Sequence, residues 1–163
     1  MRRIVVTGYG IVSPLGCGTR VVWRRLLAGQ SGIRRLSDNL VHDVPAKIAG
    51  VVPTVDEDAE GGFDLDRVVN HKDHKRMDRF IQFALAAADE AIEQSGWAPG
   101  CDAERARTAT IIGSGIGGFA TMKQAVHTTD QRGPRKLSPF TVPSFLVNLA
   151  AGQVSIRHGF RGA

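Results

Sequence analysis

The sequence predicts an α/β fold, because short β-branched runs alternate along its 163 residues with segments of helical periodicity. Residues 4–7 (IVVT) and 108–112 (TATII) each lead directly into glycine, and both are predicted to be buried strands. Helices are predicted over residues 21–28, 74–95, 119–126 and 145–157. This alternation favours a layered fold with much parallel sheet, formed by one domain or by part of a larger one.

The residues at the helix ends support these bounds. Thr19 and Ser144 are candidate N-caps, and Gly29, Gly96 and Gly159 follow the predicted last turns. The clearest helix is the one over residues 74–95, which carries an apolar stripe at helical spacing. The stripe consists of Met77, Phe80, Ile81, Ala84, Ala88, Ala91 and Ile92.

Two stretches are predicted to be loops. Residues 56–66 hold six acidic residues and no basic one, which indicates a solvated loop rather than an ion site. Residues 128–143 contain three prolines, which interrupt helical periodicity.

Composition narrows the class of protein. The formal net charge of +5 indicates either a basic face for an acidic partner or ordinary solvated surface, and composition does not choose between them. No apolar run reaches the roughly 18 residues of a membrane span, and the N-terminus turns glycine-rich too early for a signal peptide. Cys17 and Cys101 are too few for a disulfide framework, so a cytoplasmic protein is expected.

A glycine-rich motif follows the second predicted strand. Gly113, Gly115 and Gly118 match the G-x-G-x-x-G pattern of dinucleotide-binding proteins. That fingerprint also needs an acidic residue about 20 positions later, where this sequence has the basic stretch 132–136. We therefore expect the glycines to allow close approach of backbone or of a flat ligand, and we predict no nucleotide cofactor.

Neither a metal site nor a nucleophile is predicted from spacing. His71 and His74 are three residues apart and could share a helix face, but no third ligand is apparent near them in sequence. Cys17 and Cys101 would each need a nearby base to act as a nucleophile, and the sequence places none there.

The basic residues form two clusters. Lys72, Lys75, Arg76 and Arg79 open the predicted long helix, and a second cluster lies in the proline-rich loop. This second cluster consists of Arg132, Arg135 and Lys136. Cations at a helix N-terminus oppose the helix dipole, which hints at an external anion. The alternative is solvated charge offset by Asp73 and Asp78, and both interpretations stay open on composition.

Seven segments together resemble the β-ketoacyl-acyl carrier protein synthases, the condensing enzymes of fatty-acid elongation, and are closest to the synthase II type. They occur in the family's order over essentially the whole chain, which is loosest over residues 41–70. The segments are residues 5–16 (VVTGYGIVSPLG), 26–33 (LLAGQSGI), 75–82 (KRMDRFIQ), 113–118 (GSGIGG), 133–140 (GPRKLSPF), 147–152 (VNLAAG) and 159–162 (GFRG).

The resemblance implies a thiolase-like layered α/β fold, here the N-terminal half only over residues 1–163, from a family whose members are usually dimeric. These enzymes transfer an acyl chain from carrier protein to a Cys, and the carbanion from decarboxylated malonyl-carrier protein attacks that thioester. The family's Cys follows the GFRG segment in a Thr-Ala-Cys context, which is not among these residues. We therefore expect this chain to carry no catalytic residue and to be inactive alone.

The resemblance also implies binding residues. Lys72, Lys75, Arg76, Arg135 and Lys136 match the patch that receives the acidic acyl carrier protein, whose phosphopantetheine carries the acyl or malonyl group.

Two further residues match the family's acyl pocket. Ile116 matches a residue that lines this pocket, although a plain core role is the alternative. Thr141 falls where the family places a residue of the dimer neighbour, often aromatic, against the pocket.

Two other classes of function remain as alternatives to the condensing enzyme. One is a non-catalytic partner that binds carrier protein or sets chain length, and the other is a basic nucleic-acid-binding domain.

Overall fold

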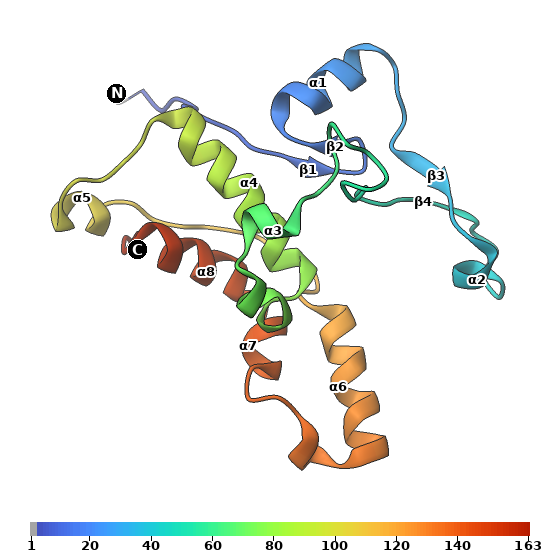
Figure 1. The fold of residues 1–163 in the computed structure, drawn as a ribbon. Coiled ribbons are helices and arrows are strands. Elements are labelled where there is room, and N and C mark those ends of the chain that lie inside the picture. The colour runs from blue at the N-terminus through green and yellow to red at the C-terminus, as the bar shows by residue number, and fades with distance from the viewer. Residues whose placement is uncertain (1–2) are drawn as a thin grey trace.

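The computed structural model describes residues 3–163 and has α4 at its centre (Figure 1). The strands are β1 (Val12–Ser13), β2 (Gly16–Cys17), β3 (Ile33–Arg35) and β4 (Ile48–Gly50). The α-helices are α1 (Thr19–Leu27), α2 (Asp38–Val41), α3 (Leu65–Val68), α4 (Arg79–Ser95), α5 (Asp102–Ala106), α6 (Phe119–Arg132), α7 (Thr141–Phe145) and α8 (Leu149–His158). The 3₁₀ helices are η1 (His71–Arg76) and η2 (Pro134–Lys136).

The core lies between α4 and α8, which run side by side (Figure 1). Ile81 and Leu85 of α4 are fully buried against Val154 of α8 and Val69, which precedes η1. The predicted stripe contained Ile81 but omitted Leu85. The buried face of α4 runs through residues 81, 85 and 88, so Leu85 belongs to it. The predicted end of the helix is confirmed, since Gly96 adopts the left-handed conformation at φ 65°.

The predicted start of the long helix at residue 74 is wrong. The chain is extended at Met77 and α4 begins at Arg79. The Asp78 carboxylate accepts hydrogen bonds from the Thr121 backbone N–H at 3.0 Å and from Thr121 Oγ1 at 2.6 Å. A contact with α6 therefore sets this boundary, and helical periodicity carries no signal of it.

The two predicted buried strands are also wrong. Ile4 is 98 % exposed and Ile111 is 91 % exposed, and neither segment belongs to a strand. Within residues 3–163 the sheets are two antiparallel pairs, β1–β2 and β3–β4, and the parallel pairings are isolated bridges at Thr54–Phe63 and Ala109–Gly162. A β-branched run is buried as a strand where neighbouring strands flank it. No strand formed by residues 3–163 lies beside residues 4–7.

The N-terminal segment instead lies directly on α4. A Cβ on Gly8 would stand 2.2 Å from Ala91 O, and one on Gly10 would stand 2.0 Å from Ala87 O. The Tyr9 backbone N–H donates to the side chain of Gln94 at 2.7 Å. Glycine is therefore required at residues 8 and 10, because backbone packs on backbone there.

Helix α1 begins at Thr19, two residues earlier than predicted. Thr19 is not the N-cap, because Gly18 holds that position and Thr19 Oγ1 donates to Glu90 of α4 at 2.8 Å. Of the predicted apolar face, Val22 is buried, whereas Trp23, Leu26 and Leu27 are exposed.

The C-terminal helices also differ from the prediction. Helix α6 continues to Arg132, so the predicted loop from residue 128 starts later. The helix predicted over residues 145–157 starts later than predicted, as α8 at Leu149, and Phe145 instead ends the separate helix α7, which is followed by an extended Leu146. Ser144 lies inside α7 and donates to Thr141 O at 2.7 Å instead of capping a helix. Gly159 ends α8 at φ 69°, as predicted.

The acidic stretch 56–66 is not simply a solvated loop. Arg25 of α1 reaches into it and donates from its two terminal guanidinium nitrogens to Asp58, and both side chains are mostly buried. The hydrogen bonds from Arg25 hold the pKa of the Asp58 carboxyl well below its ordinary value, with further lowering by the Gly61 backbone N–H. No helix in residues 3–163 combines the length and apolar character needed to cross a membrane.

Replacing Gly10 by Ala should destabilise the protein. The new methyl group overlaps the Ala87 carbonyl, and α4 cannot move away without losing its core contacts, so a loss of about 1–3 kcal/mol in unfolding free energy is expected. Denaturant unfolding of the protein at its natural length measures this. Gly113→Ala is the matched control, because nothing lies within 4 Å of a Cβ there. Equal stability of the two variants would contradict the packing of this segment on α4.

Replacing Asp58 by Asn should lower stability at neutral pH by about 1–2 kcal/mol, because Arg25 loses its charged partner. The folded-state pKa of Asp58 is depressed, so the stabilisation is present above the ordinary value of 3.8 and is lost as the pH falls towards the lowered pKa. The gap between the variant and the parent protein should therefore narrow in acid.

Melting temperatures measured across pH test this second prediction. Asp43→Asn is the control, since Asp43 is exposed and its ion pair, with His42, lies on the surface. A stability gap that does not change with pH would contradict the assignment.

Candidate functional site

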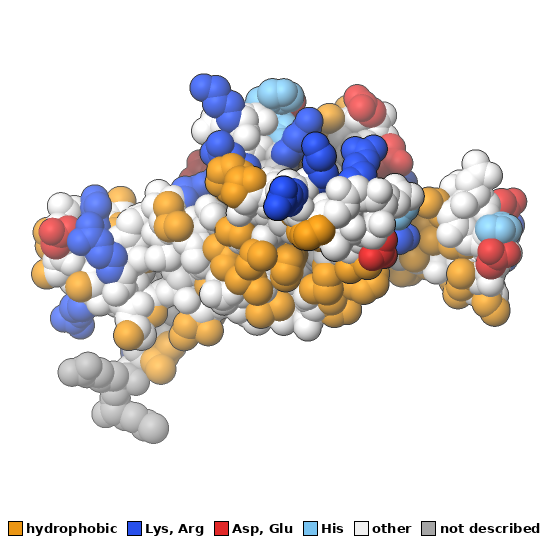
Figure 2. Space-filling model, turned by 90° about the horizontal axis from the view of Figure 1, so that it is seen from below, with side chains coloured by type: hydrophobic (Ala, Val, Ile, Leu, Met, Phe, Trp, Pro, Cys, Tyr) orange, Lys and Arg blue, Asp and Glu red, His pale blue; other side chains and the backbone are white. Residues whose placement is uncertain are grey.

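The two basic clusters border one groove. Lys75 of η1 and Lys136 of η2 line a groove of about 480 Å³, together with Thr141 at the start of α7. The floor comes from α6 and from the end of η2, with residues Ala120, Thr121, Gln124, Ala125, Thr128, Leu137 and Ser138. Figure 2, which views the end of the molecule where α6 and α7 lie, shows several Lys and Arg side chains close together beside hydrophobic ones.

The basic side chains differ in how they are held. Arg76 pairs with Asp73 at 3.0 Å, and its guanidinium lies 4.3 Å from the centre of the Phe140 ring. This cation–π contact ties η1 to the segment that leads into α7. The remaining candidates, Lys72, Lys75, Arg135 and Lys136, are exposed and form no ion pair with any carboxylate of residues 3–163.

The helix-dipole argument for an external anion does not hold as predicted. Lys72, Lys75 and Arg76 lie on η1, ahead of the break at Met77, and only Arg79 stands in the first turn of α4. The case for an anionic partner therefore depends on the exposed, unpaired cations around the groove.

The two candidate acyl-pocket residues have different surroundings. Thr141 is half-buried in the wall of the groove. Ile116 is 67 % exposed and does not belong to the core formed by residues 3–163.

The glycine motif around Ile116 packs closely only at its second half. Gly117 adopts φ 74°, and a Cβ on Gly118 would stand 2.8 Å from Phe145 Cα and from Asp78 Cβ. Gly113 and Gly115 have nothing within 4 Å of a Cβ. The close approach predicted for the motif is therefore found at residues 117 and 118 and not at the earlier glycines.

Sequence reasoning missed the polar side of the groove. Thr121, Gln124 and Thr128 recur at three- and four-residue spacing along α6, which places them on one helix face. That spacing is visible in the sequence once α6 is known to continue to Arg132.

The whole chain, residues 1–163, matches the family model described as "Beta-ketoacyl synthase, N-terminal domain". The chain belongs to the beta-ketoacyl synthase family. It is 49 % identical over 162 residues to 3-oxoacyl-[acyl-carrier-protein] synthase 2 of Rhizobium meliloti, an alignment that covers 99 % of this chain and 38 % of that protein. It is 41 % identical over 161 residues to the synthase of the same name from Vibrio cholerae, covering 99 % of this chain and 37 % of that protein.

Solved structures of the family share this fold. A beta-ketoacyl synthase from Burkholderia phymatum aligns with a TM-score of 0.79 at 23 % identity, over 100 % of this chain and 38 % of that one. A ketosynthase bound to the hexaketide, in complex with its type II PKS acyl-carrier protein, aligns with a TM-score of 0.72 at 18 % identity, over 100 % of this chain and 41 % of that one. The predicted thiolase-like α/β fold is thereby confirmed, and this chain spans a little over a third of the length of the relatives it matches.

The two cysteines have different surroundings. Burial raises the pKa of the Cys17 thiol to about 11, and the carboxylates of Asp58 and Glu90 add to the shift. Cys101 is exposed, directly before α5. A thiol held neutral in this way is a poor nucleophile, so Cys17 lacks the electropositive surroundings of a catalytic cysteine.

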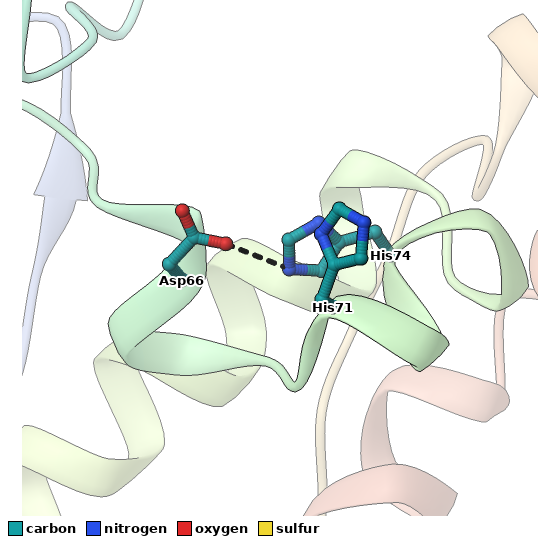
Figure 3. A group of neighbouring side chains, drawn as sticks. All are labelled: Asp66, His71 and His74. Atoms are coloured by element: carbon teal, nitrogen blue, oxygen red, sulfur yellow. Dashed lines mark ion pairs between the residues drawn. The ribbon is translucent and has the colours of Figure 1, made fainter.

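A third potential ligand, which was not apparent in the sequence, lies beside His71 and His74. Figure 3 shows Asp66 of α3 directed towards both histidines on η1. One potential ligand atom from each of the three residues lies within 4.8 Å of the others. Asp66 stands only five residues before His71, and the turn between α3 and η1 brings it back towards them.

The difference between the cysteines predicts selective alkylation. At neutral pH iodoacetamide should modify Cys101 and leave Cys17 largely unmodified, since only the thiolate reacts at a useful rate. Because the Cys17 pKa is raised, its reaction should increase as the pH approaches 11. Mass spectrometry of tryptic peptides measures both sites, and Cys101→Ser isolates the slower one. Comparable modification of both cysteines in the native protein at neutral pH would contradict this assignment.

Proposed function

We propose that this chain forms the carrier-protein-docking part of a 3-oxoacyl-acyl carrier protein synthase, which elongates acyl chains by decarboxylative condensation with malonyl-carrier protein. The observation that carries the proposal is the groove shared by Lys75, Lys136 and Thr141. It unites two of the residues proposed to dock the carrier, one from each basic cluster, with one proposed to contact the acyl chain. The 49 % identity to a synthase of this activity supports the same reaction.

Charge supports an acidic partner. Lys72, Lys75, Arg135 and Lys136 keep their charges exposed and unpaired among residues 3–163, so they are free to attract carboxylates. Exposed charges of this kind speed up encounter and orient a partner more than they add affinity. The structural relative solved in complex with an acyl-carrier protein has a partner of this class.

In this proposal Arg76 has a positioning role. Its contacts with Asp73 and Phe140 hold η1 beside the segment leading into α7, so that cations from two distant parts of the sequence face the same partner. Arg76 remains part of the proposed docking surface because its side chain is also exposed.

The acyl pocket is proposed to lie between Ile116 and Thr141. Gly113 and Gly115 have open space where a side chain would stand, so an alkyl chain can approach the backbone there. Ile116 lies next to Gly115 in the sequence and its side chain is exposed, so it is proposed to contact the acyl chain.

The nucleophile of the condensation is proposed to lie outside residues 3–163, so these residues alone should not catalyse it. Cys17 is held neutral at physiological pH, and Cys101 directly precedes α5, which lines no part of the groove. The exposed apolar side chains Ile4, Trp23 and Ile111 are proposed to be covered by further protein, including a second subunit of a homodimer.

The double variant Arg135→Glu, Lys136→Glu tests the docking surface. An exposed ion pair contributes up to about 1 kcal/mol, and reversal also adds repulsion, so carrier-protein affinity should fall about tenfold or more at low salt. The affinity of the double variant should also change less with salt concentration than that of the parent protein. Titration of the protein at its natural length with malonyl-carrier protein measures both effects.

The matched control is Arg20→Glu, Arg107→Glu, which makes the same change in net charge on exposed residues of α1 and at the end of α5. Equal losses in both double variants would show a net-charge effect and would remove the docking surface from the proposal. Carrier binding without condensation in the protein at its natural length would favour the non-catalytic partner instead.

A further inference from the structure

We propose that Asp66, His71 and His74 form a binding site for a divalent transition-metal ion of the zinc class. The three potential ligand atoms lie within 4.8 Å of one another (Figure 3). Two imidazoles and one carboxylate are a ligand set that binds such ions in proteins and leaves a fourth position open. The inference does not depend on the proposed condensing function.

The local backbone brings the two histidines onto one face. Residues three apart are eclipsed in a 3₁₀ helix, because it has three residues per turn. His71 and His74 are three apart on η1, and their ring centres lie 4.9 Å from each other. An α-helix over the same residues would rotate these side chains away from each other by about 60°.

Helix α3 is held so that Asp66 faces the histidines. The Asp64 side chain caps α3 by accepting from the backbone N–H groups of Asp66 at 3.1 Å and Arg67 at 3.3 Å. Val69, between α3 and η1, is buried in the core beside Ile81. The cap and the buried valine fix both ends of the turn that joins the ligands.

The distances suit a shared ion. Asp66 Oδ1 lies 3.4 Å from His74 Nε2. With metal–ligand bonds of about 2.0–2.1 Å, two ligands on a tetrahedral ion are separated by about 3.4 Å. His74 is 16 % exposed and Asp66 is 81 % exposed. His74 therefore provides a fixed ligand, and the side chains of Asp66 and His71 can turn to complete the site.

The carbonyl of Val69 supplies a further contact. It lies 2.8 Å from His74 Nε2, so a proton on that nitrogen would be donated to Val69 O when no metal is bound. A metal ion takes the place of this proton, which makes binding compete with protons and weaken as the solution is acidified.

The surrounding charge selects the class of metal. Lys72 and Lys75 flank the histidines on η1, and Arg67 follows Asp66. These cations disfavour Mg²⁺ and Ca²⁺, which bind through charge and several oxygen ligands. Imidazole favours Zn²⁺, Co²⁺, Ni²⁺ and Cu²⁺, for which the nitrogen ligands outweigh the neighbouring charge.

Calorimetric titration of the protein at its natural length with Zn²⁺ tests the site, and Co²⁺ serves as a spectroscopic probe. We expect one ion per chain and a visible Co²⁺ absorption that requires both histidines. His71→Ala, His74→Gln and Asp66→Asn should each weaken Zn²⁺ binding by at least about tenfold, because loss of even an outer hydrogen-bond partner costs about 10–100-fold in metal sites. In His74→Gln the amide can still donate to Val69 O, so the fold is kept.

His42→Ala is the matched control. His42 forms a surface pair with Asp43 at 2.9 Å, and neither belongs to the three-residue cluster. Unchanged binding in this control, with losses in the three variants, would support the proposal. Zn²⁺ binding that survives His71→Ala, that falls equally in His42→Ala, or that does not occur at all would overturn it.

Discussion

The carboxylate of Glu90, in the C-terminal half of α4, is the contact on which the N-terminal third of the structure depends. It accepts hydrogen bonds from the backbone N–H groups of Ile11 at 3.0 Å and Thr19 at 2.6 Å, and from Thr19 Oγ1 at 2.8 Å. Charge-assisted bonds of this kind are stronger than neutral ones, and here one side chain holds both the incoming segment and the first turn of α1. Gly8 and Gly10 are necessary for the same reason, because any side chain there would keep the backbone too far from α4 for these bonds to form.

A second carboxylate controls the opposite end of α4. Asp78 accepts from Thr121 and thereby joins the start of α4 to α6, while its own backbone N–H donates to Ser144 O at 3.2 Å. These bonds bring η1, α6 and α7 together, and the groove between Lys75, Lys136 and Thr141 lies among them. The α4 helix thus connects two regions of different character, an uncovered apolar surface at one end and a basic groove at the other.

The features that could be predicted from the sequence are those that local physics determines. The stops at Gly96 and Gly159 follow from the left-handed conformation that glycine adopts without strain, and the periodicity of α4 follows from its buried face. The prediction that residues 4–7 and 108–112 form buried strands failed, because a strand is buried by its neighbours and these residues do not pair with one another. Motif resemblance identified the family and the basic residues, but the groove that unites them depends on contacts far apart in sequence.

The candidate metal site was not predicted because the contacts of Asp78 change where α4 begins. Had the helix begun at residue 74, as its periodicity indicated, His71 would lie outside it and the two rings would have no reason to face each other. The bonds from Thr121 to Asp78 instead end the helical segment before Met77, and the residues ahead of the break form the tighter η1. In that geometry three-residue spacing aligns His71 with His74, and the turn at the buried Val69 returns Asp66 to them. The same contact that positions the basic groove therefore also assembles the candidate metal site.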